Sequence, residues 1–176
     1  MRDPRVTTPL RLRPPGPNDE DEFRTAHRTM AAEDFPFGLF YDPGTVWTDY
    51  LGTLAACRRG TDLPPGRVRS AFLVADVAGA IVGRSSVRFE LNDFLAYEGG
   101  HIGYCVLPQH RRRGHATEIL QQSLVIARAG GVERALITCE DANVGSATVI
   151  ERCGGVLESV VTPSDGAAPF RRYWIG

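Results

Sequence analysis

The sequence predicts one α+β or mixed-sheet domain. Its 176 residues suit a single domain of ordinary size that can bury a full hydrophobic core. Hydrophobic residues make up 43% of the chain, which is usual for a globular protein. The expected elements follow in the order β-α-α-β-β-β-α-β-α-β-β, with antiparallel hairpins at the front and a strand–helix–strand unit at the back. No repeat or obvious linker divides the chain, so residues 1–176 are expected to form one domain.

The first strand and the first helix are predicted by chain breakers and capping residues. Leu10 to Arg13 form a short expected strand, closed by the proline-rich stretch from Pro14 to Pro17. Asn18 or Asp19 can then cap a helix that runs to about Ala32. Acidic residues in its first turn favour the positive end of the helix dipole.

A second helix is expected from about Thr45 to Arg59, where apolar residues recur at helical spacing. Between the two helices lies the aromatic segment Phe35 to Tyr41, which is expected to be a loop. Gly60 to Arg69 contains Pro64-Pro65-Gly66 and is expected to connect the helix to the sheet.

Three further strands are expected between residues 71 and 107. Residues 71–76 and 80–90 predict an antiparallel hairpin that turns near Ala78-Gly79. A further strand is expected at His101 to Leu107, where Pro108 stops it.

The second half predicts alternating helices and strands. Gly114 to Ala129 is the clearest helix, because its apolar residues fall on one face and Gly130-Gly131 ends it. A buried strand at Arg134 to Cys139 and a helix at Asn143 to Cys153 follow. The last two strands are expected at residues 156–162 and 170–175.

Charge and cysteine usage exclude several classes of protein. The formal net charge is -1, whereas a nucleic-acid binder usually carries a basic excess. The four cysteines match no zinc or CxxC pattern, so we expect reduced thiols, no metal site and a cytoplasmic location; they are Cys57, Cys105, Cys139 and Cys153. No segment approaches about 18 continuous apolar residues, and no apolar leader begins the chain, so membrane association is not expected.

The stretch from His101 to Ala116 carries the chemical signal: a strand, a basic loop and a helix start. A helix N-terminus offers unpaired N–H groups and a positive dipole end, which together bind phosphate. Gly114 allows close backbone approach, and Arg111-Arg112-Arg113 adds positive charge. The pattern lacks the second glycine of the dinucleotide fingerprint and the Gly-Lys-Ser/Thr end of the P-loop, which disfavours both.

These residues resemble the GCN5-related N-acetyltransferase (GNAT) family. Its pyrophosphate loop, Gln/Arg-x-x-Gly-x-Gly/Ala, is similar to Arg111-Arg-Arg-Gly114-His-Ala116, with Val106-x-Pro108 in its usual place before it. The resemblance continues through residues 135–139 and Asn143-x-x-Ser146, and covers about residues 70–162 well. It implies a central, mostly antiparallel sheet, splayed at its middle strands and flanked by helices. It also implies transfer of acetyl from acetyl-CoA to a primary amine by direct attack in a ternary complex.

The resemblance also implies roles for individual residues. Backbone groups of three strand residues would pair with the pantetheine arm: Tyr104, Cys105 and Val106. Amides of the loop and helix start would hold the pyrophosphate: Arg112, Arg113, Gly114, His115 and Ala116. Arg111 would add charge together with its two neighbours. Asn143 would form a hydrogen bond with the pantetheine, and Ser146 would lie near the cofactor.

The reaction needs a neutral amine, so a base or a water chain should remove a proton. His101 lies roughly where the histone-acetylating branch of the family carries its glutamate base, and Glu98 and Glu140 are alternatives. A backbone N–H near Val106 would polarise the thioester oxygen. The family commonly has a tyrosine acid seven residues after the asparagine, where this chain has Ile150. The general acid is therefore unassigned, with Tyr173 as a substitute.

Other interpretations stay open at this stage. His101 could be structural, Asn143 could be only a helix cap, and the aromatic segment could be core rather than a border of the acceptor pocket. The chain could also be a non-catalytic acyl-CoA sensor or interaction domain of the same fold. The acceptor is expected to be a small-molecule or peptide amine, and Glu33, Asp34 and Asp42 could favour a cationic one. Homodimers are common among similar proteins, and the sequence leaves that option open.

Overall fold

A computed structural model of the chain describes residues 9–176; residues 1–8 of the expected domain lie outside this range. The seven strands of this part are β1 (Arg11–Arg13), β2 (Ser70–Val77), β3 (Ala80–Arg88), β4 (Ile102–Val106), β5 (Ala135–Glu140), β6 (Val156–Val161) and β7 (Phe170–Ile175). The α-helices are α1 (Glu20–Ala31), α2 (Trp47–Arg59), α3 (Asp93–Tyr97), α4 (His115–Ala129) and α5 (Val144–Arg152). The mixed α and β architecture is the predicted fold class.

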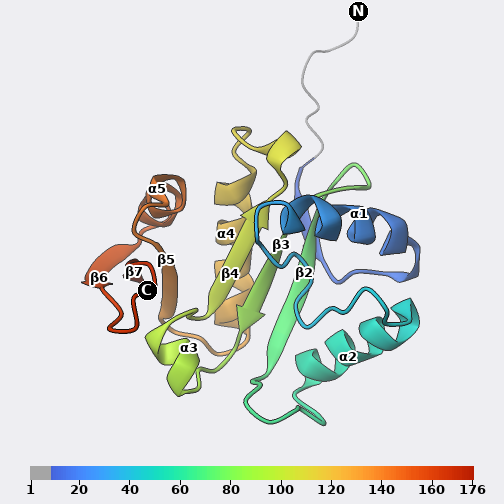
Figure 1. Cartoon of the computed structure of the whole chain (residues 1–176), viewed down its shortest axis with the longest axis horizontal. Helices are drawn as coiled ribbons and strands as arrows, with labels where there is room; N and C mark the ends of the chain where they lie inside the picture. Colours follow the sequence, from blue (N-terminus) through green and yellow to red (C-terminus); the bar gives the residue numbers. More distant parts are fainter. Residues whose placement is uncertain (1–8) are drawn as a thin grey trace, which may run out of the picture.

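The strands form two sheets that meet at one point. One sheet has the order β1-β2-β3-β4 and the other has the order β5-β7-β6, and all pairs within them are antiparallel. Figure 1 shows β4 and β5, the facing edges of the two sheets, next to each other. The His101 N–H donates to the Leu136 carbonyl at 2.7 Å, which joins the edges at the start of β4. Beyond this point the strands are not paired, so the sheet is splayed in the middle, as the family resemblance implies.

Gly100 is required where the two sheets meet. Its φ of 61° lies in the left-handed region. A Cβ atom at this position would come within 2.3 Å of the Leu136 carbonyl oxygen. The backbone of the first sheet can therefore approach β5 closely only because this residue has no side chain.

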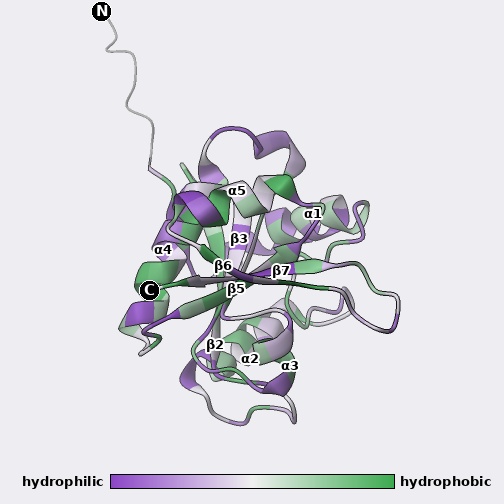
Figure 2. Ribbon diagram, turned by 90° about the vertical axis from the view of Figure 1, so that its left-hand side faces the viewer, coloured by the Kyte–Doolittle hydropathy of each residue, from purple (hydrophilic) through white to green (hydrophobic). Residues whose placement is uncertain are grey.

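Helices cover opposite faces of the first sheet. Figure 2 shows α4 on one side of the strands and α1 on the other. Toward α1 and α2 the core is rich in aromatic side chains, with Phe23 packed between the rings of Phe37 and Trp47. Toward α4 and α5 the core is mostly aliphatic and includes Ile102 of β4 and Ile150 of α5. Both clusters bury their members almost fully, which fixes the helices against the sheets.

The structure differs from the sequence prediction mainly in short elements. The helix α3 was not predicted, because five residues are too few to show a helical period. Its signal is Asn92, whose side-chain oxygen accepts the Leu95 N–H at 2.9 Å and caps the helix. The second helix begins at Trp47 rather than Thr45, and the third strand ends at Arg88 rather than Glu90.

Candidate active site

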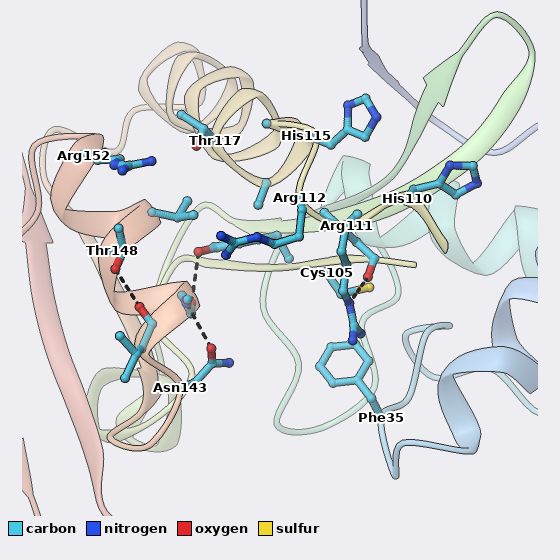
Figure 3. A pocket seen from close by; sticks show the side chains of 18 of the residues that line it. Phe35, Cys105, His110, Arg111, Arg112, His115, Thr117, Asn143, Thr148 and Arg152 are labelled. Carbon is cyan, nitrogen blue, oxygen red and sulfur yellow. Dashed lines mark hydrogen bonds between the residues drawn. The ribbon is translucent and has the colours of Figure 1, made fainter. Parts of the chain in front are cut away.

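A groove of about 990 Å³ opens where β4 and β5 diverge. The end of β4, the start of α4, the first turns of α5 and the segment after α1 form its walls, as Figure 3 shows for the labelled side chains. Of the eleven residues predicted to bind the cofactor, ten line this groove: Tyr104, Cys105, Val106, Arg111, Arg112, Gly114, His115, Ala116, Asn143 and Ser146. Arg113 is exposed and is not part of the lining.

The loop before α4 and the first residues of the helix lie at the groove and carry backbone amides without a protein partner among the described residues. Gly114 is the residue before the helix and has a φ of 85°, a left-handed conformation that glycine adopts without strain. Both Thr117 and Glu118 donate their N–H groups to the Gly114 carbonyl. Within residues 9–176, the N–H groups of residues 112–116 have no protein acceptor. With the positive end of the helix dipole, they form an anion site.

Arginine side chains surround this anion site unequally. Arg111 pairs with Glu33, with Nη2 and Oε2 2.6 Å apart, and its Nε donates to the Val106 carbonyl. That pairing lowers the pKa of Glu33. Figure 3 shows Arg112 extending toward α5 and Arg152 extending from α5 toward α4. The charge near the helix start therefore comes from Arg112 and Arg152, while Arg111 ties the groove to the segment after α1.

Arg152 is the charged residue on α5 that lines the groove and that the sequence prediction did not include. Ser146, Val149 and Arg152 follow at three-residue intervals and all line the groove, so they share one face of α5. That face could have been identified only after α5 had been placed beside the helix start of α4.

The open edge of β4 is formed by alternate residues. The Arg88 N–H donates to the His101 carbonyl and the Leu107 N–H to the Val82 carbonyl, so residues 101 and 107 turn their backbone groups toward β3. In an antiparallel pair this direction alternates along the strand, so Cys105 also faces β3. Tyr104 and Val106 face away from it, toward the groove. The pantetheine contact expected of the Cys105 backbone is therefore corrected: those groups belong to the β3 ladder.

Three predicted residues connect β4 and α5 across the groove. The Asn143 side-chain oxygen accepts the Ser146 N–H at 3.0 Å, so Asn143 caps α5. The hydroxyl groups of Ser146 and Tyr104 are 3.0 Å apart and share a hydrogen bond. Burial raises the pKa of Tyr104 to about 12, so this hydroxyl stays protonated at neutral pH.

The three predicted bases do not line the groove. His101 is 9% exposed, and its Nδ1 accepts the Leu136 N–H at 2.9 Å. Burial, and then the charge of Arg88, lowers its pKa, so the ring is neutral near pH 7 with its proton on Nε2. Glu98 and Glu140 are exposed and lie outside the groove lining. Two hydrogen bonds with Leu136 hold His101 at the junction of the two sheets.

Neither Ile150, at the family's tyrosine position, nor Tyr173, the suggested substitute acid, lines the groove. Ile150 is fully buried in the core between α5 and the sheets, as an ordinary apolar position. Tyr173 is also fully buried, and its hydroxyl donates to Glu151 at 2.9 Å. The residues of the aromatic segment have different environments. Phe37 lies in the core, whereas Phe35 lines the groove.

Two negative findings concern residues 9–176. No cluster of three or more metal-ligating side chains is found there. No helix among these residues has the length and apolar character needed to cross a membrane. The four cysteines are free thiols.

Comparison with known proteins gives a consistent result. Residues 9–156 match the model of the acetyltransferase (GNAT) domain. The structure is similar to that of RimL, a ribosomal L7/L12 alpha-N-protein acetyltransferase in complex with coenzyme A, with a TM-score of 0.67, 18% identity and coverage of 97% of this chain and 96% of that chain. The microcin C7 self-immunity acetyltransferase MccE, in complex with acetyl-CoA and AMP, has a TM-score of 0.67, 17% identity and coverage of 94% and 91%.

An N-acetyltransferase from Staphylococcus aureus Mu50 is similar as well, with a TM-score of 0.66, 16% identity and coverage of 95% and 98%. At these identities the likeness concerns the fold. No curated protein matches the chain.

Proposed function

The chain belongs to the acetyltransferase (GNAT) family, and from this premise we propose that it transfers an acetyl group from acetyl-CoA to a primary amine by direct attack in a ternary complex. One observation carries the proposal. The free amides at the start of α4 open onto the same groove as the unpaired edge of β4. An anion site and an extended backbone edge, side by side, suit the two ends of a diphosphate-linked pantetheine thioester.

The cofactor would bind with its diphosphate on the amides of residues 112–116, supported by the charges of Arg112 and Arg152. The pantetheine arm would extend along β4 and pair with the backbone groups of Tyr104 and Val106, as an added strand does. The side-chain amide of Asn143 would donate to the arm, since its oxygen already caps α5. Arg111 would have to release the Val106 carbonyl, with which it is bonded at 3.1 Å.

The transfer would proceed by attack of the amine nitrogen on the thioester carbonyl carbon, followed by cleavage of the carbon–sulfur bond. The Val106 N–H at the open edge would stabilise the developing oxyanion. A second proton leaves the attacking nitrogen as the carbon–sulfur bond breaks and ends on the coenzyme A sulfur or in solvent. The first proton must leave the acceptor ammonium before attack. His101, Glu98 and Glu140 could take it only through water, since none of them lines the groove.

The departing thiolate would need a donor other than the missing tyrosine at position 150. The Tyr104 hydroxyl faces the groove, is held by Ser146 and remains protonated. It would donate a hydrogen bond to the sulfur rather than its proton, because a thiol is far more acidic than a phenol whose pKa is about 12.

The first test measures binding and turnover separately. Acetyl-CoA at about 100 times its dissociation constant should stabilise the fold by about 2.7 kcal/mol, which corresponds to a melting temperature raised by roughly 5–10 °C. Free coenzyme A, separated by chromatography because the four protein cysteines are free, should accumulate with at least one amine of a broad panel.

No stabilisation at millimolar acetyl-CoA would contradict the proposal. Stabilisation without turnover on any amine would favour the non-catalytic acyl-CoA sensor instead.

A further inference from the structure

The groove has a single acidic side chain in its wall. Of the residues 9–176 that line it, only Glu33 carries a carboxylate. Three arginines supply positive charge to the same wall: Arg111, Arg112 and Arg152. Glu33 follows α1 by two residues, in the turn that leads to the aromatic segment. A cationic molecule that enters the groove beside the cofactor therefore has one anionic side chain to approach.

Arg111 links Glu33 to the open edge of β4. Its Nη1 and Nη2 donate to Oε1 and Oε2 of Glu33 at 3.1 and 2.6 Å. Its Nε donates to the Val106 carbonyl at 3.1 Å. One guanidinium group thus spans the space between the carboxylate and the strand edge. The side chains of Arg111 and Glu33 are 43% and 41% exposed, so solvent and small solutes reach this bridge.

Cofactor binding has to break the bridge. The pantetheine arm, as proposed above, takes the backbone groups of Val106, so Arg111 must leave that carbonyl. The diphosphate then offers the guanidinium another anion nearby. An exposed ion pair contributes little to stability, so its exchange costs little. A primary ammonium group is a cationic N–H donor too, and it can take the guanidinium's place between Glu33 and the strand edge.

The other titratable groups of the wall are poor acceptors for a proton. Burial raises the pKa of Tyr104 to about 12 and raises the pKa of the Cys105 thiol, so both groups are already protonated at neutral pH. His110 and His115 belong to the loop and the helix start at the anion site, where a bound diphosphate favours their charged forms. Glu33 is ionised at neutral pH, because Arg111 lowers its pKa.

We infer that Glu33 is the catalytic base and takes the first proton from the acceptor ammonium once acetyl-CoA has drawn Arg111 away. This inference rests on the proposed function. The N–H bond breaks, its electron pair stays on nitrogen and attacks the thioester carbonyl carbon, and the proton passes through the carboxylate to solvent. Acetyl-CoA binds before the acceptor, since Arg111 otherwise holds Glu33. The acceptor class is an alkyl amine that is protonated at neutral pH.

The test compares a primary alkyl amine with its β,β-difluoro analogue as acceptors. Fluorine makes the amine much less basic, so the analogue is mostly neutral at neutral pH and needs no base for the first proton. Glu33→Gln should lower kcat/KM for the alkyl amine by about 100-fold, and for the analogue by less than about fivefold. Equal losses for both amines, or no loss for either, would overturn the inference and leave the proposed function standing.

Two controls separate this role from folding and from cofactor binding. Glu33→Gln should bind acetyl-CoA at least as tightly as the wild type in a calorimetric titration, because the pair that competes for Arg111 is weakened. An affinity loss of about tenfold or more would place Glu33 in the cofactor site instead and contradict the inference. Glu133→Gln removes the same charge from an exposed position outside the groove lining and should leave both amine rates unchanged.

A binding measurement covers the case in which no turnover is seen. With coenzyme A present, an alkyl amine of the panel should raise the melting temperature of the wild type further, and Glu33→Gln should abolish this increase. The same amine without coenzyme A should have no effect. Equal increases in both proteins, or none in the wild type with any amine, would overturn the inference whether or not the protein is an enzyme.

Discussion

Replacing Ala116 with aspartate is expected to weaken acetyl-CoA binding by about 100-fold or more, equivalent to about 2.7 kcal/mol. Ala116 lies in the first turn of α4 and lines the groove. A carboxylate there would occupy the anion site and repel the diphosphate. Because acids in the first turn of a helix interact favourably with its dipole, the unliganded protein should be at least as stable as the wild type. Calorimetric titration with acetyl-CoA, together with urea unfolding, measures both quantities.

The matched control is Ala116→Ser, which is similarly small and adds a hydroxyl that can donate to phosphate. It should bind acetyl-CoA within about threefold of the wild type, or about 0.7 kcal/mol. If Ala116→Asp bound acetyl-CoA as tightly as Ala116→Ser, the diphosphate could not lie at the start of α4.

Replacing His101 with alanine is expected to lower the free energy of unfolding by about 2–3 kcal/mol, because the buried Leu136 N–H would lose its acceptor. His101→Asn keeps an oxygen near the place of Nδ1 and should restore at least about 1 kcal/mol of that loss. Urea unfolding measures the differences. The acetyl-transfer rate of His101→Asn should stay within about threefold of the wild type. A rate that falls by orders of magnitude at unchanged stability would instead restore the catalytic assignment of His101.

The same histidine should make stability depend on pH. Burial lowers its pKa below the usual 6.5, so below pH 6.5 the unfolded chain binds a proton that the folded chain does not. Its contribution to stability is therefore present above pH 6.5 and decreases as the pH falls toward the folded-state pKa. The pKa values of His27 and His110 are also lowered, so the informative quantity is the difference between the wild type and His101→Asn. This difference should shrink on acidification.

Much of the fold follows from local signals. Gly114 before an apolar helix, the prolines after the first strand and the glycines that end α4 and α5 set boundaries that the structure reproduces within a few residues. Of the residues that the motifs selected for cofactor binding, all but Arg113 line the groove. These features depend on neighbours in the sequence, and sequence alone can therefore identify them.

The remaining features depend on distant partners. The position of His101 on its strand suggested a base, but the sequence gives no sign that its Nδ1 accepts the N–H of Leu136, which belongs to another sheet. Arg111 likewise pairs with Glu33 of the segment after α1, far away in the sequence. Which element packs beside a residue determines its chemistry in each case.

The most direct test of the proposed cofactor site is a comparison of acetyl-CoA with acetyl-pantetheine, which lacks the diphosphate, by NMR of the backbone amides. Both compounds should shift the amide signals of Tyr104 and Val106 on the open edge of β4. Only acetyl-CoA should shift the Gly114, His115 and Ala116 amide protons strongly downfield, as hydrogen bonds to phosphate do. Equal shifts of those three amides with both compounds, or none with acetyl-CoA, would contradict the binding of the diphosphate by the start of α4.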